Sequence, residues 1–460
     1  GANTGANNTA VGAYVLDVNT SGQNNIGMGV NTLGQNTTGS FNVGIATSAL
    51  GDNTTGGNNV AVGYGALASN TTASGNSAFG LSALAANTTG SNRTAIGVES
   101  SKGSDTETDR TVSVGHRAMY MNAATTADAT DSVAVGYLAL GATAATTASL
   151  INNTGVGAYA LSFNSSTTAT ANYNAAVGTS AMQFNANTTG TVQANAALGY
   201  EALEVNANTT GTVTNNTAVG YQALKSASNT SGTIRYNVAV GSNALDVCVA
   251  SNNTAVGTSA LGVNTTGAGN TAIGKSAGSA ITTGGENIAI GFDAGLTGSP
   301  GGNITTSNRY VLIGDENIAQ AHIQVDWTVA SDARDKTDFT ALDLGLDFVK
   351  DLQPVTYKWD KRSQYGDKTA DDYDLTSQTP DGTHKEDWLD IGFKAQEVEA
   401  LEIAAGYNKD NKTNLVSSHT DDGKQMGLQY SKFVPILVKA IQEQQALIEA
   451  LTARITTLEG

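Results

Sequence analysis

The sequence predicts a mainly β protein, in which a repetitive β-solenoid or β-roll rod precedes a small α+β domain that ends in a coiled-coil helix. A short motif, Asn-x-Ala-Val-Gly-x-x-Ala-Leu, recurs through the first three hundred residues. The composition then changes near residue 330, from a chain rich in Asn, Thr, Gly and Ala to an ordinary globular one. The predicted parts are the rod (1–298), a cap and transition (299–330), an α+β domain (331–430) and a C-terminal helix (431–460).

The motif glycine repeats with a short and regular period. The steps are 17 residues at first, then one of 18 and several of 21, and finally 16 or 17. A unit of this length holds one or two short strands and a turn in which Asn and Gly tolerate positive φ. The position is occupied by Gly12, Gly29, Ala46, Gly63, Gly80, Gly97, Gly115, Gly136, Gly157, Gly178, Gly199, Gly220, Gly241, Gly257, Gly274 and Gly291.

Such a unit cannot fold alone, because three or four small apolar side chains do not offset the ordering entropy of seventeen residues. Coils that stack about 4.8 Å apart would give a rod on the order of 75 Å long. Repeated Asn side chains are expected to form ladders along it. The extra residues of the longer units, as in 184–187 and 204–207, are interpreted as outward loops. A helical repeat array stays open as an alternative, because the Ala-Leu end of the motif would also suit a helical turn.

The rod is expected to be a homotrimer. A coil of this size encloses little apolar volume, which favours three chains sharing one core; a rod built from a single chain is the alternative. At its end, residues 321–329 alternate as a strand would, and Trp327 is expected to plug the last coil.

Composition excludes several classes of function. The net charge of −17 divides into about −6 for residues 1–300 and −11 for 301–460, with no basic stripe, so a nucleic-acid partner is not expected. Cys248 is the lone cysteine and is expected to be buried; the four histidines are scattered, so neither a metal nor a cofactor is predicted. No apolar run is long enough to predict insertion in a membrane.

The C-terminal part carries four motifs in a fixed order. They are Ser-Asp-Ala-Arg-Asp-Lys at 331–336, Leu-Gly-Leu-Asp-Phe-Val-Lys-Asp-Leu-Gln-Pro-Val-Thr-Tyr-Lys-Trp at 344–359, Ile-Gly-Phe-Lys-Ala-Gln-Glu-Val at 391–398, and Tyr-Ser-Lys-Phe-Val-Pro-Ile-Leu at 430–437. This set resembles the self-cleaving intramolecular chaperone domain of phage tailspikes, endosialidases and neck appendages. The Asn-Thr-Ala-Val-Gly units of the rod resemble the head repeats of trimeric adhesins and phage tail fibres.

The resemblance implies that the C-terminal domain trimerises, guides the fibre into register and is then released. It implies cleavage of the Ala330-Ser331 bond, with Ser331 as nucleophile and Lys336 as base. A serine hydroxyl needs such a base, and a lysine can serve once burial or a nearby cation lowers its pKa. Arg334 is a candidate for that cation, and Asp332 for orienting Arg334 or the backbone. The alternative is that these residues merely form a turn and cap the next helix.

The last helix shows the spacing of a coiled-coil seam. Ile and Leu at the two seam positions favour two strands by rule, whereas the resemblance implies a trimer, and Gln444 is expected to fix the register. The seam residues are Leu437, Ile441, Gln444, Ile448, Leu451, Ile455 and Leu458.

Three functions remain. The first is a structural and adhesive fibre of a phage virion, which binds a host surface receptor, glycan or protein, and joins other virion proteins at its N-terminal end. Its only enzymatic activity would be one autoproteolytic cut, with no external substrate. A bacterial surface adhesin or extracellular filament is the alternative. A glycan-depolymerising tailspike is the third, although the rod carries mostly one carboxylate per repeat, whereas a glycosidase needs two in a cleft.

Overall fold

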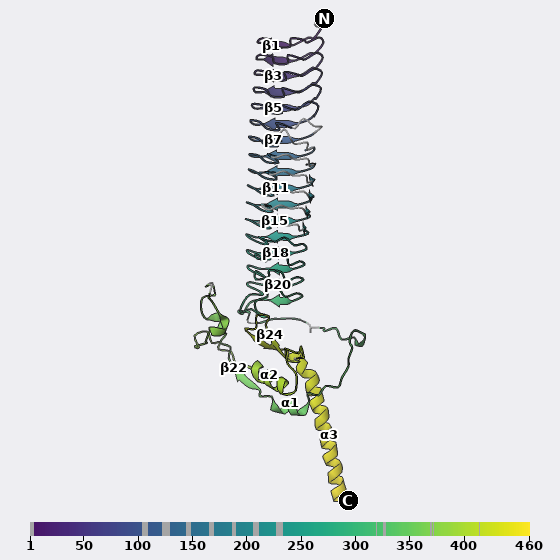
Figure 1. The fold of residues 1–460 in the computed structure, drawn as a ribbon, viewed down its shortest axis with the longest axis vertical. Helices are drawn as coiled ribbons and strands as arrows, with labels where there is room; N and C mark the ends of the chain where they lie inside the picture. Colours follow the sequence, from purple (N-terminus) through teal and green to yellow (C-terminus); the bar gives the residue numbers. More distant parts are fainter. Residues whose placement is uncertain are drawn as a thin grey trace. The chain divides into compact units, whose positions relative to one another are not determined.

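The computed structural model describes residues 4–103, 109–121, 129–143, 149–164, 170–185, 190–205, 211–226, 233–318, 320–324, 328–368, 370, 372–413 and 415–460. The chain divides into two compact units (Figure 1). The solenoid unit comprises Gly1–Asp293 and Thr305–Val311, and the C-terminal unit comprises Ala294–Ile304 and Leu312–Gly460. Each unit is described by itself.

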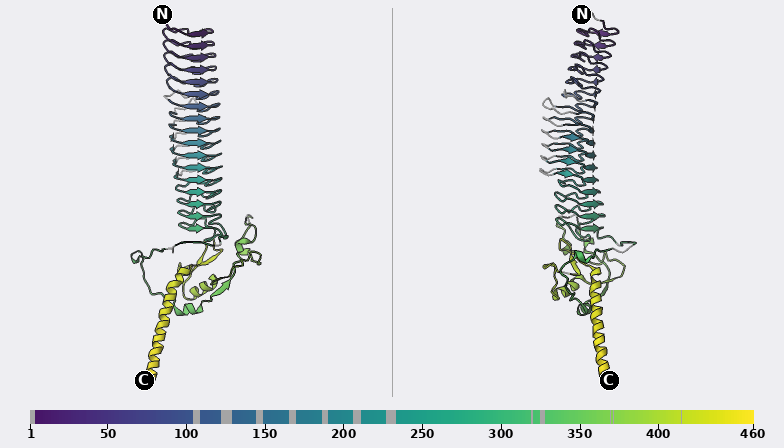
Figure 2. Two further views of the ribbon diagram at one scale, coloured as in Figure 1. Left: turned by 180° about the vertical axis from the view of Figure 1, so that it is seen from behind. Right: turned by 90° about the vertical axis from the view of Figure 1, so that its right-hand side faces the viewer.

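The solenoid unit is a stack of coils, each of which places a three-residue strand beside the equivalent strand of the next coil (Figures 1 and 2). The pairing is parallel and in register, as in Ala218 with Ala239. The strands are β1 (Thr9–Val11), β2 (Ile26–Met28), β3 (Val43–Ile45), β4 (Val60–Val62), β5 (Ser77–Phe79), β6 (Thr94–Ile96), β7 (Val112–Val114), β8 (Val133–Val135), β9 (Thr154–Val156), β11 (Ala175–Val177), β13 (Ala196–Leu198), β15 (Thr217–Val219), β17 (Val238–Val240), β18 (Thr254–Val256), β19 (Thr271–Ile273), β20 (Ile288–Ile290) and β21 (Val311–Ile313). The predicted β-solenoid is therefore confirmed.

The longer units add a second, narrower sheet. It consists of the two-residue strands β10 (Ala171–Asn172), β12 (Val192–Gln193), β14 (Val213–Thr214) and β16 (Ile234–Arg235), again parallel and in register. Of the residues expected to form outward loops, 186–187 and 206–207 lie outside the described residues. Phe184 and Val205 are buried and bridge to each other, so the interpretation as outward loops is wrong for these two.

The Ala-Leu end of the motif forms a turn. Its leucine adopts positive φ, 51° at Leu67 and 53° at Leu224, which a right-handed helical turn does not allow. The motif glycine is needed for a different reason. Gly63 has φ 135°, and a Cβ there would lie 2.5 Å from the carbonyl oxygen of Gly80 in the next coil.

The core of the solenoid unit is filled by small apolar residues and by asparagine. In most coils the central residue of the strand is a buried alanine and the Ala-Leu pair is buried as well, as at Ala61, Ala66 and Leu67. The amide of Asn59 donates to the Ala73 carbonyl at 2.9 Å, and its backbone N–H donates to the Asn42 side-chain oxygen at 3.0 Å. The predicted asparagine ladders are thus confirmed.

These ladders also show how one chain encloses a core, since side-chain amides satisfy the backbone where apolar volume runs short. The homotrimer stays a prediction. Cys248 is buried, as predicted, and burial raises the pKa of its thiol to about 11. Residues 320–324 and 328–330 contain no strand, so that prediction for 321–329 is wrong where the structure describes it; Trp327 lies outside the described residues.

The C-terminal unit is a small α+β assembly. Its helices are α1 (Leu346–Asp351), α2 (Ala395–Ala404) and α3 (Phe433–Glu459), with short 3₁₀ turns η1 (Ala333–Asp335), η2 (Arg362–Gln364), η3 (Leu375–Ser377) and η4 (Tyr430–Lys432). Strands β22 (Val355–Tyr357) and β23 (Asp390–Gly392) form one antiparallel pair, and β24 (Ser417–His419) and β25 (Met426–Leu428) form another. Buried residues of α1, α2 and the start of α3 form its core, including Phe348, Val398 and Ile436.

Candidate active site

The predicted cleavage residues flank the 3₁₀ turn η1. Asp332 caps this turn: its side chain accepts from the backbone N–H of Arg334 at 2.9 Å. The turn is closed by the N–H of Lys336, which donates to the Ala333 carbonyl at 3.3 Å. These residues therefore form a capped turn, as the alternative interpretation predicted. The same turn determines where the side chains of Ser331 and Lys336 lie.

Ser331 and Lys336 are brought together. The Nζ of Lys336 donates to the Oγ of Ser331 at 2.6 Å. A base must lie within hydrogen-bond reach of the proton that it removes, and this distance satisfies that requirement. Both side chains are exposed, as is Ala330 on the other side of the proposed scissile bond. Lys336 is exposed, so the burial that could activate it is not observed.

The guanidinium group of Arg334 contacts both carboxylate oxygens of Asp332. Its Nε lies 3.1 Å from each carboxylate oxygen, and its Nη2 lies 2.5 Å from Oδ2. These hydrogen bonds lower the pKa of Asp332 below its usual value. The contacts agree with an orienting role for Asp332 toward Arg334. They give no contact of the guanidinium with Lys336, so Arg334 as the activating cation stays a prediction.

The predicted seam of α3 lies on the outside of the unit. Ile436 and Ala440, on the neighbouring side of the helix, are buried, whereas Leu437 and Ile441 are exposed. The seam continues exposed through Ile448, Leu451, Ile455 and Leu458. The helix therefore has buried residues near its start and a second apolar stripe in solvent.

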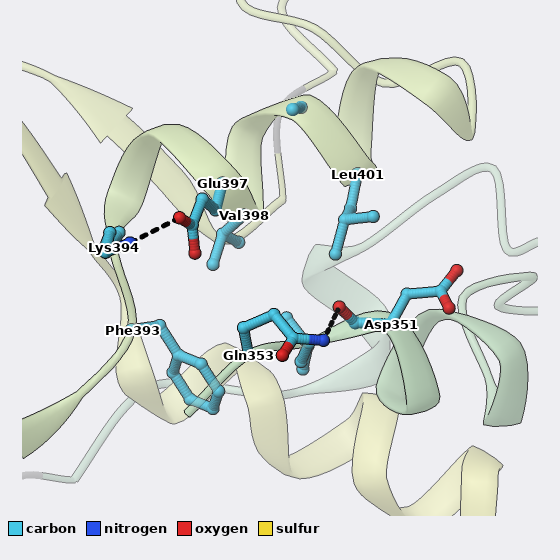
Figure 3. Close-up of a pocket in the computed structure, with 9 residues that line it drawn as sticks. Asp351, Gln353, Phe393, Lys394, Glu397, Val398 and Leu401 are labelled. Carbon is cyan, nitrogen blue, oxygen red and sulfur yellow. Dashed lines mark hydrogen bonds and ion pairs between the residues drawn. The ribbon is translucent and has the colours of Figure 1, made fainter. Parts of the chain in front are cut away.

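The C-terminal unit has a groove that the sequence did not predict. It lies between the end of α1 and α2, has a volume of about 200 Å³, and is lined by Leu352, Phe393, Val398 and Leu401 (Figure 3). Lys394 and Glu397 form an ion pair of 2.7 Å at its rim. Nothing in the sequence indicated this groove, because its walls come from segments about forty residues apart.

A cluster of charges on the solenoid unit was also missed. Lys225 contacts the carboxylate of Glu201 and lies 3.2 Å from Glu204 of the preceding coil. Burial alone would raise the pKa of Glu201, but hydrogen bonds from Lys225, Tyr200 and Gln222 outweigh it and lower the pKa to about 2. A glycosidase needs a carboxylic acid with a raised pKa, so Glu201 does not fit the role of that acid.

Two further findings concern the described residues only. They contain no group of three His, Cys, Asp or Glu side chains placed to hold a metal ion. No helix among them is both long enough and apolar enough to cross a bilayer.

Comparison with known protein families gives a match to the C-terminal part of the chain. Residues 331–407 match the family described as "Chaperone of endosialidase", and the match begins at Ser331. No curated protein and no solved structure matches the chain. A β-solenoid followed by a region similar to this chaperone fits a tailspike-type or fibre-type protein.

Proposed function

We propose that this chain is a fibre of a phage virion that attaches to a host surface, and that residues 331–460 assemble the fibre and then cut themselves off before Ser331. The proposal rests on one observation: the start of the family match and the predicted nucleophile are the same residue. The family match starts at Ser331, and that residue accepts a hydrogen bond from Lys336 at 2.6 Å. The proposed nucleophile, its base and the start of the family match thus fall within six residues.

Because Ser331 and Lys336 are both exposed, we expect cleavage to occur only after assembly. A lysine can accept the serine proton only in its neutral form, which burial favours. Packing of further copies around Lys336 would bury this side chain. Cleavage would then follow trimerisation and leave the fibre kinetically trapped without its template.

The solenoid unit offers a surface for further copies. The third residue of each of its three-residue strands is apolar and points away from the core, so that these residues form an apolar stripe along the sheet. Its exposed members include Met28, Phe79, Ile96, Ile273 and Ile290. Exposed apolar patches of this kind mark interaction surfaces. Together with the exposed seam of α3, this stripe supports the homotrimer.

The proposal is tested on the full-length chain by denaturing electrophoresis and intact mass. Wild type is expected to give fragments 1–330 and 331–460. Ser331→Ala and Lys336→Met are each expected to give one uncut chain, because one removes the nucleophile and the other its base. Lys350→Met is the matched control: Lys350 lies within the matched region but pairs with Asp347. Equal cutting in wild type and Ser331→Ala would overturn the dyad.

A bacterial surface adhesin built from the same parts is the second candidate. The resemblance of the rod repeats to trimeric adhesin heads favours it. Isolation of the native particle decides between the two, since a portal or baseplate in the same particle supports the virion fibre, and recovery with the bacterial envelope supports the adhesin. The depolymerase is tested by incubation with capsule or lipopolysaccharide, where new reducing ends would support it.

A further inference from the structure

Two tyrosines lie side by side on the outside of the solenoid unit. Tyr200 and Tyr221 directly follow the motif glycine in consecutive coils, and their ring centroids are 5.5 Å apart with planes 11° from parallel. About half of each side chain is exposed, 45% for Tyr200 and 50% for Tyr221. The equivalent residues of the flanking coils are Thr179 and Ser242. Each ring is therefore covered by the other on one face, and has only a small residue on the opposite side.

The backbone holds this pair in place. The N–H of Gln222 donates to the Tyr200 carbonyl at 2.9 Å, and the N–H of Asn243 donates to the Tyr221 carbonyl at 2.9 Å. These bonds belong to the regular stacking of the coils, so the ring positions are fixed before any ligand binds. Such pre-organisation reduces the entropic cost of binding.

A row of polar side chains runs beside the rings. The residues that follow in the three coils are Glu201, Gln222 and Asn243. Gln222 donates from Nε2 to Glu201 at 2.8 Å, and Asn243 donates from Nδ2 to the Oε1 of Gln222 at 3.2 Å. The two amides thus present oriented donors and acceptors next to an aromatic surface, which is the combination of apolar contact and few placed polar groups found in ligand sites.

The local charge excludes one class of ligand. Glu201 and Glu204 outnumber Lys225, which contacts both. With a pKa of about 2, Glu201 stays ionised at physiological pH. An anionic polymer would meet a net negative surface and be repelled.

The geometry points to a binding site for a neutral polysaccharide on this tyrosine surface, which comprises Tyr200, Tyr221, Glu201, Gln222 and Asn243. A sugar ring has an apolar C–H face that packs on an aromatic ring, and a rim of hydroxyls that exchange hydrogen bonds with amides. Sugar rings on the tyrosines would place their hydroxyls beside Gln222 and Asn243. The inference rests on the proposed attachment role and names the chemistry of the receptor.

The chain contains a matched control for the rings. Tyr64 also follows its motif glycine and is 61% exposed. Its flanking coils carry Thr47 and Leu81 at this position, and Gly65 takes the place of the polar side chain. Tyr64 therefore has the same backbone setting without a stacked partner or an amide row.

The test uses the full-length protein and calorimetric titration with tetraoses of glucose, galactose, mannose and N-acetylglucosamine, and with sialic acid and galacturonic acid tetramers as anionic probes. Wild type is expected to bind at least one neutral tetraose and neither anionic one. Tyr200→Ala and Tyr221→Ala should each weaken that binding about tenfold, the effect of losing one stacking contact. Tyr221→Phe should retain it, and Tyr64→Ala should leave it unchanged. Circular dichroism and melting curves establish that each variant is folded.

Binding of the same proteins to whole cells of a strain panel separates this inference from the attachment role. Cell binding that Tyr200→Ala/Tyr221→Ala retains in full would overturn the glycan site and leave attachment standing. Tetraose binding without cell binding in any strain would support the site and speak against attachment. Absence of neutral tetraose binding, or tighter binding of the anionic probes, would overturn the site.

Discussion

The solenoid unit and the C-terminal unit solve the folding problem in opposite ways. In the solenoid unit each coil repeats the same contacts, and buried residues such as Ala61 and Asn59 are satisfied by the neighbouring coils of one chain. In the C-terminal unit each contact occurs once, and large apolar side chains stay in solvent, with Trp388 and Ile391 both 77% exposed. The solenoid unit completes its core within one chain, and both units leave apolar side chains in solvent.

This difference indicates which unit can determine the register between copies of the chain. A repeat specifies each coil by its neighbours but does not fix where a second chain should pair with it, since every register along the stripe looks alike. A unit with unique contacts binds in one register only. Under the proposed assembly role, the C-terminal unit would therefore align the copies, and the solenoid unit would persist after cleavage.

Removal of residues 331–460 should have the largest effect. Without the aligning unit, we expect the exposed apolar stripe to pair out of register, so that the truncated chain is insoluble or misassembled. Ser331→Ala is the control, because the uncut chain keeps its aligning unit and should stay soluble. Solubility and mass by light scattering provide the measurement. Soluble, heat-resistant trimers of the truncated chain would show that the solenoid unit aligns itself.

A glycine of the stack should be the next most sensitive position. Gly80 has φ 138°, and a Cβ there would lie 2.4 Å from the carbonyl oxygen of Gly97. Gly80→Ala should cost roughly 2–5 kcal/mol through backbone strain and steric clash. Gly382→Ala in the C-terminal unit also has positive φ, 93°, but nothing lies within 4 Å of its Cβ position, so it should cost only about 1 kcal/mol. Urea unfolding of each variant measures the difference, and equal costs would mean that the coils adjust their spacing.

Glu402 should be the most sensitive polar residue of the C-terminal unit. Its buried carboxylate accepts backbone N–H groups of Leu415 at 2.9 Å, Val416 at 2.6 Å and Ser417 at 3.0 Å. Glu402→Gln replaces one acceptor by a donor and should cost about 2–3 kcal/mol. The exposed Glu397→Gln should cost less than about 1 kcal/mol.

Calorimetry of the intact chain gives the measurement for Glu402→Gln. The melting transition of the C-terminal unit should move down while that of the solenoid unit stays in place. If both transitions moved together, the two units would not be independent in stability, and the contrast between them would have to be abandoned.

The sequence predicts the solenoid unit well, because the repeat determines its strands and their pairing. The period predicts parallel strands in register, and register in turn predicts the asparagine ladders, because equivalent residues of successive coils must face each other. The same alignment would have shown that Glu201, Gln222 and Asn243 share one position, so the signal for that polar row was present in the sequence.

Other features depend on contacts that no spacing reveals. Glu402 meets β24 only because the chain returns after α2, and no pattern around Glu402 marks it for burial. The buried amides that enclose the core within one coil, such as Asn59, become visible only once the coils are stacked. Ser331 and Lys336 were named from a resemblance, and their 2.6 Å contact depends on the 3₁₀ turn between them.

The charge cluster of the solenoid unit predicts a pH dependence. The pKa of Glu201 is lowered to about 2, below about 4.3 for an unfolded chain, so its contribution to stability is present above that value and is lost as pH falls toward 2. The melting temperature of wild type should therefore fall more steeply between about pH 5 and pH 2 than that of Glu201→Gln. Asp52→Asn is the control at an exposed carboxylate. Parallel curves for wild type and Glu201→Gln would contradict the assigned pKa.

The smallest effect should come from the one motif position that breaks the repeat. Ala46 occupies the glycine position with φ 93°, where a side chain costs about 1–2 kcal/mol. Ala46→Gly removes this strain but adds the entropic cost of glycine, about 0.5–1 kcal/mol, so the net gain should be about 0.5 kcal/mol. Ala61→Gly, at the buried centre of a strand, has no strain to relieve and should lose about 1 kcal/mol. Opposite shifts of the urea midpoint would show that the repeat constrains backbone conformation residue by residue, whereas a loss in both would show that Ala46 is held without strain.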